Sequence, residues 1–245
     1  MLVVLRDAWT TLVPDVKGRH GPLPPLMLAL TVVTGLVDAF SYLVLGHVFV
    51  ANMTGNVVFS GFAIAGAAGF SLAASLVALG SFAAGALLGG RIAHRARAHR
   101  GRVLYLTLVP QTILVAAAYV VAQVSGSPAY GGGVRYALIV LLGLGMGVQN
   151  AAARALAVPD LTTTVLTLTI TGIASDSRLA GGPGSRIGRR MVSAGAMFLG
   201  ALLGALAALH GHPAQPLLFA GLMLAVATAA AFALTPSDAG WTEPL

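Results

Sequence analysis

One acidic residue, Asp38, lies inside a long apolar stretch of this 245-residue sequence, whereas the other six acidic residues lie in terminal segments or at the ends of such stretches. A carboxylate at the centre of a membrane-spanning helix costs about 2.5–3.5 kcal/mol, so such a residue usually faces a partner or water. Two interpretations of Asp38 are therefore open. It is either a proton- or cation-linked site, or a structural anchor that caps broken backbone near residues 54–56.

Two polar stretches have the groups needed to bind a small solute or line a pore. In the first, the amide and hydroxyl groups of Asn52, Thr54 and Asn56 surround Gly55, which permits a break in the helix. The polar residues of the second stretch are Gln149, Asn150, Thr163, Thr164, Thr167 and Thr169. The alternative role for both stretches is hydrogen bonding between helices, which is common for Asn and Thr in membranes.

Other kinds of site are not indicated. The chain has no cysteine, which excludes disulfides and thiolate ligands. His47, His210 and His212 have no acidic or thiolate neighbours with which to complete a metal site. The sequence also has no GxSxG, HExxH or P-loop motif. We therefore expect no enzymatic activity, no cofactor and no metal.

The composition is that of an integral membrane protein. Hydrophobic residues make up 57% of the chain and charged residues only 9%, against about 25% charged residues in soluble domains. Lys and Arg number fourteen against seven acidic residues. These cations lie in short loops, a pattern typical of membrane topology rather than nucleic-acid binding. The expected environment is a lipid bilayer, and no nucleic-acid partner is expected.

Eight apolar stretches are each about as long as the roughly 20 residues that a membrane span requires. They cover residues 25–46, 47–69, 71–93, 103–124, 136–154, 157–175, 191–210 and 214–235. The preceding segment, 1–24, is expected to form an interfacial helix or a disordered tail. Residues 236–245 are expected to form a short polar tail.

Three pairs of similar runs occur in the same order along the chain, which indicates that the chain consists of a half and its duplicate. The GALLG run at 85–89 recurs at 200–204, GLVDA at 35–39 has a counterpart in GVQNA at 147–151, and the polar run at 52–56 has one at 165–169. Two of these runs carry paired glycines that let helices pack closely, either between the halves or between protomers. The glycines are Gly85, Gly89, Gly200 and Gly204.

The positive charges favour one topology. If all eight stretches cross the membrane, eight cations lie on one side and six on the other. If the stretches 47–69 and 157–175 instead each enter and leave the membrane on the same side, thirteen cations lie inside and only Arg135 lies outside. Each half then crosses the membrane three times. Because three is an odd number, the second half is inverted relative to the first, as in many transporters. A cavity is expected on the pseudo-twofold axis that relates the halves.

Two runs, GLVDAFSYL at 35–43 and GHVFVANMTGNVV at 46–58, resemble the YoaK family of bacterial inner-membrane proteins. The run GMGVQNAA at 145–152, followed by a Thr-rich stretch, also resembles that family. The resemblance covers residues 25–235 and implies a multi-pass inner-membrane protein whose function is unknown. Members of the family usually have a glycine within the Thr-rich stretch, where this chain has Leu168.

The sequence therefore predicts an all-α membrane protein with six transmembrane helices, two re-entrant segments and an inverted 3+3 repeat. The predicted parts are a cytoplasmic segment 1–24, a first half 25–102 that continues into helix 103–124, a second half 136–235 and a cytoplasmic tail 236–245. The predicted function is a small-solute transporter or channel in the inner membrane. The alternative is a structural or regulatory membrane module. The Gly-rich helices would also allow a homo-oligomer.

Overall fold

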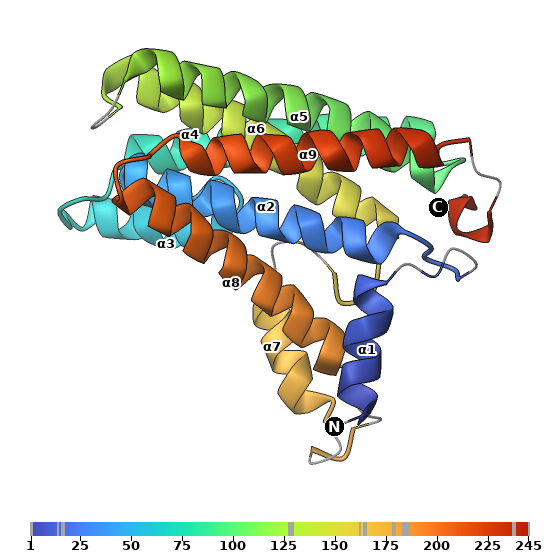
Figure 1. Ribbon diagram of the computed structural model, residues 1–245. Coiled ribbons are helices and arrows are strands. Elements are labelled where there is room, and N and C mark those ends of the chain that lie inside the picture. The colour runs from blue at the N-terminus through green and yellow to red at the C-terminus, as the bar shows by residue number, and fades with distance from the viewer. Residues whose placement is uncertain are drawn as a thin grey trace.

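The computed structural model consists of helices joined by loops. It describes residues 2–13, 15, 18–126, 130–161, 163, 166–177, 180–182, 187–236 and 239–244. No β-strand occurs among these residues. The helices are α1 (Leu2–Leu12), α2 (Leu23–Val44), α3 (Met53–Ile64), α4 (Leu72–Ala96), α5 (Arg100–Ser125), α6 (Gly132–Leu156), α7 (Leu166–Ser175), α8 (Ile187–Leu209), α9 (Gln215–Leu234) and the short 3-10 helix η2 (Gly240–Thr242) (Figure 1).

Six helices are long and apolar enough to cross a membrane, which confirms the predicted number of spans. They are α2, α4, α5, α6, α8 and α9, each of 20 to 26 residues. At about 1.5 Å per residue, these lengths match a hydrocarbon core of about 30 Å. The stretches 47–69 and 157–175 differ from the others, because each contains only a short helix, α3 or α7, preceded by a loop.

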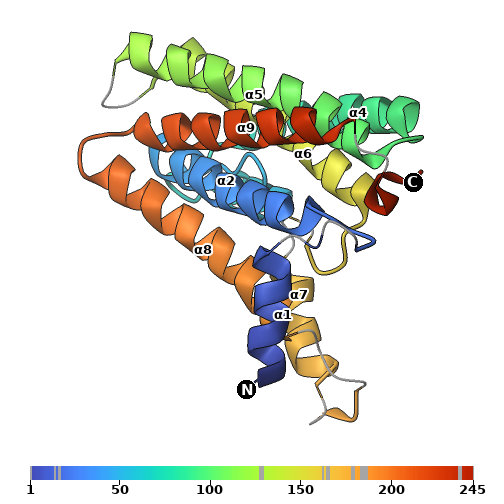
Figure 2. The same cartoon turned by 45° about the vertical axis from the view of Figure 1, so that its right-hand side comes forward.

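The helices form a bundle with an oblique arm. Helices α2, α5, α6 and α9 run side by side, and α8 crosses α2 at an angle (Figures 1 and 2). Helices α1 and α7 lie beside the first turns of α8, below the bundle in both views. The most buried spans are α2 and α6, so these two helices form the interior while the others expose apolar side chains to lipid.

Helices α2 and α6 run in opposite directions, and an arginine contacts the end of each. Arg135, near the start of α6, donates a hydrogen bond to the carbonyl oxygen of Gly46 just beyond α2, at 3.2 Å. Arg100, at the start of α5, donates to the carbonyl oxygens of Leu156 at 2.6 Å and Arg19 at 3.1 Å. Cations at helix C-termini satisfy free carbonyl groups and the helix dipole.

The paired glycines lie where α4 crosses α6 and where α8 crosses α2. A Cβ atom added at Gly85 in α4 would overlap the carbonyl oxygen of Leu144 in α6, and one at Gly200 in α8 would overlap that of Val32 in α2. Gly89 and Gly204 lie one turn further along the same contacts. These faces are therefore occupied within the chain, and they do not provide the contact between copies that the sequence allowed.

Residues 239–244 pack against the bundle, whereas the sequence predicted only a short polar tail. Trp241 in η2 is 1% exposed. Its ring covers Gly21, which has φ +45°, and contacts Gly101 at the start of α5. The segments before α2 and after α9 therefore meet at the same end of the bundle, as an even number of crossings requires.

Candidate functional site

Asp38 holds the loop that follows its own helix. Its Oδ1 atom accepts hydrogen bonds from the backbone amides of Val50 at 3.1 Å and Ala51 at 2.9 Å, while Oδ2 accepts one from the side-chain amide of Asn52. The side chain is buried. All of these donors belong to the non-helical segment between α2 and α3, so Asp38 satisfies backbone groups that have no helical partner.

Asn56 fixes the same loop from the other side. Its Nδ2 donates to the carbonyl oxygen of Phe49 at 2.6 Å, and its Oδ1 accepts from the Phe49 backbone amide at 3.0 Å. Asn56 is completely buried. A side-chain amide that pairs with both the backbone N–H and the backbone C=O of one residue replaces the partners that a helix would supply. Asn56 therefore positions the loop.

Thr54 and Gly55 have other surroundings. Thr54 is exposed on the outer face of α3. Gly55 lies against the ring of Phe49, which would clash with a Cβ atom there. Phe49 in turn stacks on Tyr42, with ring centroids 5.0 Å apart and an interplanar angle of 24°. This aromatic cluster, which also includes Phe59 and Phe70, was missed from the sequence because its members are scattered over nearly thirty residues.

A cavity of about 350 Å³ opens beside Asp38, between α2, α8 and the loop. We call it the α2 cavity. Its lining includes Asp38, Tyr42, Phe49 and Asn52. The α8 side supplies only the apolar residues Met197, Ala201 and Ala205. Two candidate site residues, Asp38 and Asn52, therefore share this cavity.

The polar residues of the second half do not form one site. Gln149 lies in the core, where it accepts a hydrogen bond from Gln111 at 2.5 Å and donates to Thr34 at 2.8 Å. Thr163 is buried with φ +63°, and Thr169 is also buried. Thr167 is exposed on α7, and Thr164 lies outside the described residues.

Asn150 lines a second and larger cavity, of about 930 Å³, between α4, α6 and the residues just after α6. We call it the α6 cavity. Asn150 donates to the carbonyl oxygen of Met146 at 3.0 Å. The lining also includes His94 and Arg97 from the end of α4 and Arg154 from the last turn of α6. Its described lining contains no acidic residue.

Several lining residues of the two cavities are related by the offsets that separate the matching runs of the sequence. Asp38, Ala39, Tyr42 and Leu43 of the α2 cavity correspond, 112 positions later, to Asn150, Ala151, Arg154 and Ala155 of the α6 cavity. Met197, Ala201 and Ala205 correspond, 115 positions earlier, to Phe82, Ala86 and Gly90. The α2 cavity thus lies where α2 crosses α8, and the α6 cavity lies where α6 crosses α4.

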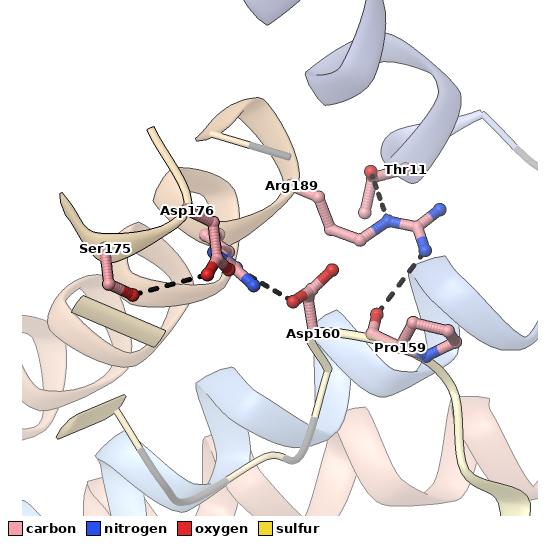
Figure 3. Close-up of polar contacts among 7 residues, drawn as sticks. Thr11, Pro159, Asp160, Ser175, Asp176 and Arg189 are labelled. Carbon is pink, nitrogen blue, oxygen red and sulfur yellow. Dashed lines mark hydrogen bonds and ion pairs between the residues drawn. The ribbon is translucent and has the colours of Figure 1, made fainter. Parts of the chain in front are cut away.

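The loop that borders the α6 cavity is fixed by two arginines of α8. Arg190 pairs with Asp160 and Asp176, each at 2.8 Å. Arg189 donates to Thr11 in α1 at 3.3 Å and to the carbonyl oxygen of Pro159 at 3.4 Å (Figure 3). This ion-pair cluster was missed from the sequence, in which the partners of Arg190 lie 30 and 14 positions away.

The loop has an unusual backbone. Ala157, Asp160 and Thr163 all have positive φ angles, of 46°, 62° and 63°, and such angles are uncommon for residues other than glycine. The hydroxyl of buried Thr163 has no hydrogen-bond partner among the described residues. The contacts from α8 to Pro159 and Asp160 therefore hold a strained backbone in place.

Comparisons with known proteins identify the family. Residues 26–230 match the model of the family described as "Protein of unknown function (DUF1275)". The "UPF0700 transmembrane protein YoaK" of Bacillus subtilis (strain 168) is 33% identical over 153 residues, which cover 62% of this chain and 65% of that protein. The matched part is thus just under two thirds of the relative's length. No solved structure matches the chain. The chain is a multi-pass membrane protein that belongs to the DUF1275 family, to which the resemblance to YoaK pointed.

Proposed function

We propose that the protein is a carrier for a small solute, in which the α2 cavity and the α6 cavity are the entrances on opposite faces of the membrane. The equivalence of the two cavities is the observation that supports this proposal most strongly. A carrier must offer its substrate similar routes from each face, and an inverted repeat provides them by exchanging the roles of its halves. The proposal includes no catalytic step.

The packing of the helices supports an inverted repeat. Gly35 in α2 packs against the backbone of residues 197–201 in α8, and Gly147 in α6 packs in the same way against residues 82–86 in α4. Helices α2 and α6 also run in opposite directions, with the end of α2 near the start of α6. Two halves related by a twofold axis in the membrane plane have both properties.

The short helices support re-entrant segments. Helix α3 lies at the end of the bundle where α2 ends and α4 begins, whereas α7 lies below the bundle, beside the start of α8, in the connection between α6 and α8 (Figure 1). Each connection therefore returns to the end from which it started. With this topology the positive-inside rule places both termini and thirteen of the fourteen cations in the cytoplasm, across an inner membrane.

A structural or regulatory membrane module is the second candidate, and the hydrogen bonding of the interior favours it. The carboxylate of Asp38 is occupied by the loop donors. Between the two cavities, Gln149 joins α6 to α2 through Thr34 and to α5 through Gln111. Such satisfied buried networks make a bundle rigid, which a module without transport would also need.

Accessibility to a small charged thiol reagent separates the two candidates. The chain has no native cysteine, so the equivalent residues Ala86 and Ala201, one in each cavity, can be replaced singly as Ala86→Cys and Ala201→Cys. A carrier exposes each cysteine to both faces of a vesicle in turn. A rigid module exposes each to one face only. The variant Ala67→Cys in an exposed loop is the control, since it should react from one face in either case.

A further inference from the structure

The α6 cavity differs from its counterpart mainly in charge. Arg154 takes the place of Tyr42, and Asn150 takes the place of Asp38. Arg97 and His94 add two further nitrogen-bearing side chains from the end of α4. The described lining of the α2 cavity thus has a carboxylate and no arginine, whereas that of the α6 cavity has two arginines and no carboxylate.

The two arginines have no carboxylate partner within the described part of the chain. The ion pairs found there are those of Arg190 with Asp160 and Asp176. Arg97 and Arg154 are exposed and border a cavity large enough for a small organic molecule. Guanidinium groups bind phosphate and carboxylate oxygens through paired hydrogen bonds, and two permanent positive charges match the charge of a phosphate dianion.

We infer that the α6 cavity binds a phosphate group of an anionic ligand, which Arg97 and Arg154 hold from α4 and α6. The ring of His94 lies in the same cavity and offers a further nitrogen for a hydrogen bond. This inference rests on the proposed function, because it assigns a ligand class to one of the two entrances. The ligand is either a free small anion or the headgroup of an anionic lipid, since both present the same phosphate chemistry.

The α2 cavity explains why the inference concerns one entrance only. There the carboxylate of Asp38 would repel a phosphate group, and the described lining of the α2 cavity includes no arginine. A ligand held by the α6 cavity would therefore leave it on transfer toward the other face. Binding is expected to be strong at the face where α6 ends and weak at the face where α2 ends.

Thermal unfolding of the full-length protein in detergent tests this assignment with two probes. Inorganic phosphate represents a free anion, and phosphatidylglycerol in mixed micelles represents a lipid headgroup, with sodium chloride of equal ionic strength as the reference. A ligand at ten times its Kd should raise the Tm of the unmodified protein by about 3–6 °C. Arg97→Gln and Arg154→Gln should each abolish most of this rise.

Helix α4 offers a matched control for the loss of one positive charge. Arg91 and Arg95 lie on the same helix, but neither lines the α6 cavity. Arg91→Gln and Arg95→Gln should therefore keep the full rise. If the cations serve only to set topology, all four variants should respond alike. The variant Arg154→Lys keeps the charge and should retain part of the rise.

The outcomes identify the source of the phosphate group. A rise with inorganic phosphate that follows the expected variant pattern shows a free anion, and a rise with phosphatidylglycerol alone in that pattern shows a lipid headgroup. No rise with either probe, or an equal rise in all four variants, overturns the inference. That failure is distinct from failure of the proposed function, because the cysteines at positions 86 and 201 report two-sided access whether or not phosphate binds.

Discussion

The hydroxyl groups of Thr112 in α5 and Thr228 in α9 lie 2.9 Å apart and share a hydrogen bond, although the two residues are 116 positions apart in the chain. In the proposed inverted repeat they occupy corresponding places in the two halves. Equivalent residues can contact one another only near the axis that relates the halves. Together with the glycine contacts of α4 with α6 and of α8 with α2, this pair supports the proposed twofold axis.

The glycines at the crossings should tolerate no side chain. Gly85→Ala and Gly200→Ala each place a Cβ atom against a carbonyl oxygen of the facing helix, and we expect a loss of about 1–3 kcal/mol of stability from each. Gly90→Ala and Gly195→Ala, where nothing lies within 4 Å, should be neutral or stabilising by up to about 1 kcal/mol. Thermal unfolding of the four variants in detergent checks this. Equal effects at crossing and control positions would contradict the packing.

The carboxylate of Asp38 and the amide of Asn52 should be exchangeable between the two positions. Asp38→Asn sets two amide groups against each other, and Asn52→Asp sets two carboxylates against each other, so each should cost about 1–3 kcal/mol of stability. The double variant, Asp38→Asn with Asn52→Asp, restores one donor and one acceptor and should recover most of the loss. A double-mutant cycle on thermal stability measures the coupling. Unchanged stability in Asp38→Asn together with lost transport would instead identify Asp38 as a proton- or cation-linked site.

The ion pairs of Arg190 should control the mobility of α7. Arg190→Gln releases Asp160 before α7 and Asp176 after it, so we expect faster amide hydrogen exchange in residues 157–161 and 166–177. Helix α3 is the internal control, because its preceding loop is fixed by Asp38 and Asn56 instead. Exchange in residues 53–64 should not change. An unchanged rate around α7 would show that these ion pairs do not restrain it.

Much of the fold could be predicted because membrane spans leave a local signal. The six long helices follow from apolar runs of about 20 residues, and the glycines of the crossings follow from the repeated GALLG run. The burial of Trp241 could not be predicted in the same way. Its contacts, Gly21 and Gly101, lie far away in the chain, and nothing near residue 241 indicates them.

The candidate site was predicted less completely. The sequence singled out Asp38 as the one deeply placed acid but left its role open, because the decisive donors are the backbone amides of Val50 and Ala51. A backbone amide has no signature in the sequence. The arginines of the α6 cavity were interpreted as determinants of membrane topology. Only the folded chain places Arg97 and Arg154 in one cavity with Asn150.

The central claim is that the two halves are inverted, and the sidedness of four exposed positions tests it most directly. Single variants Ala98→Cys and Ala180→Cys lie in the basic loops after α4 and α7, while Ala67→Cys and Ser125→Cys lie after α3 and at the end of α5. We predict that an impermeant maleimide labels the first pair only from the cytoplasmic face of the membrane and the second pair only from the opposite face. Labelling of positions 98 and 180 from opposite faces would contradict the inverted arrangement.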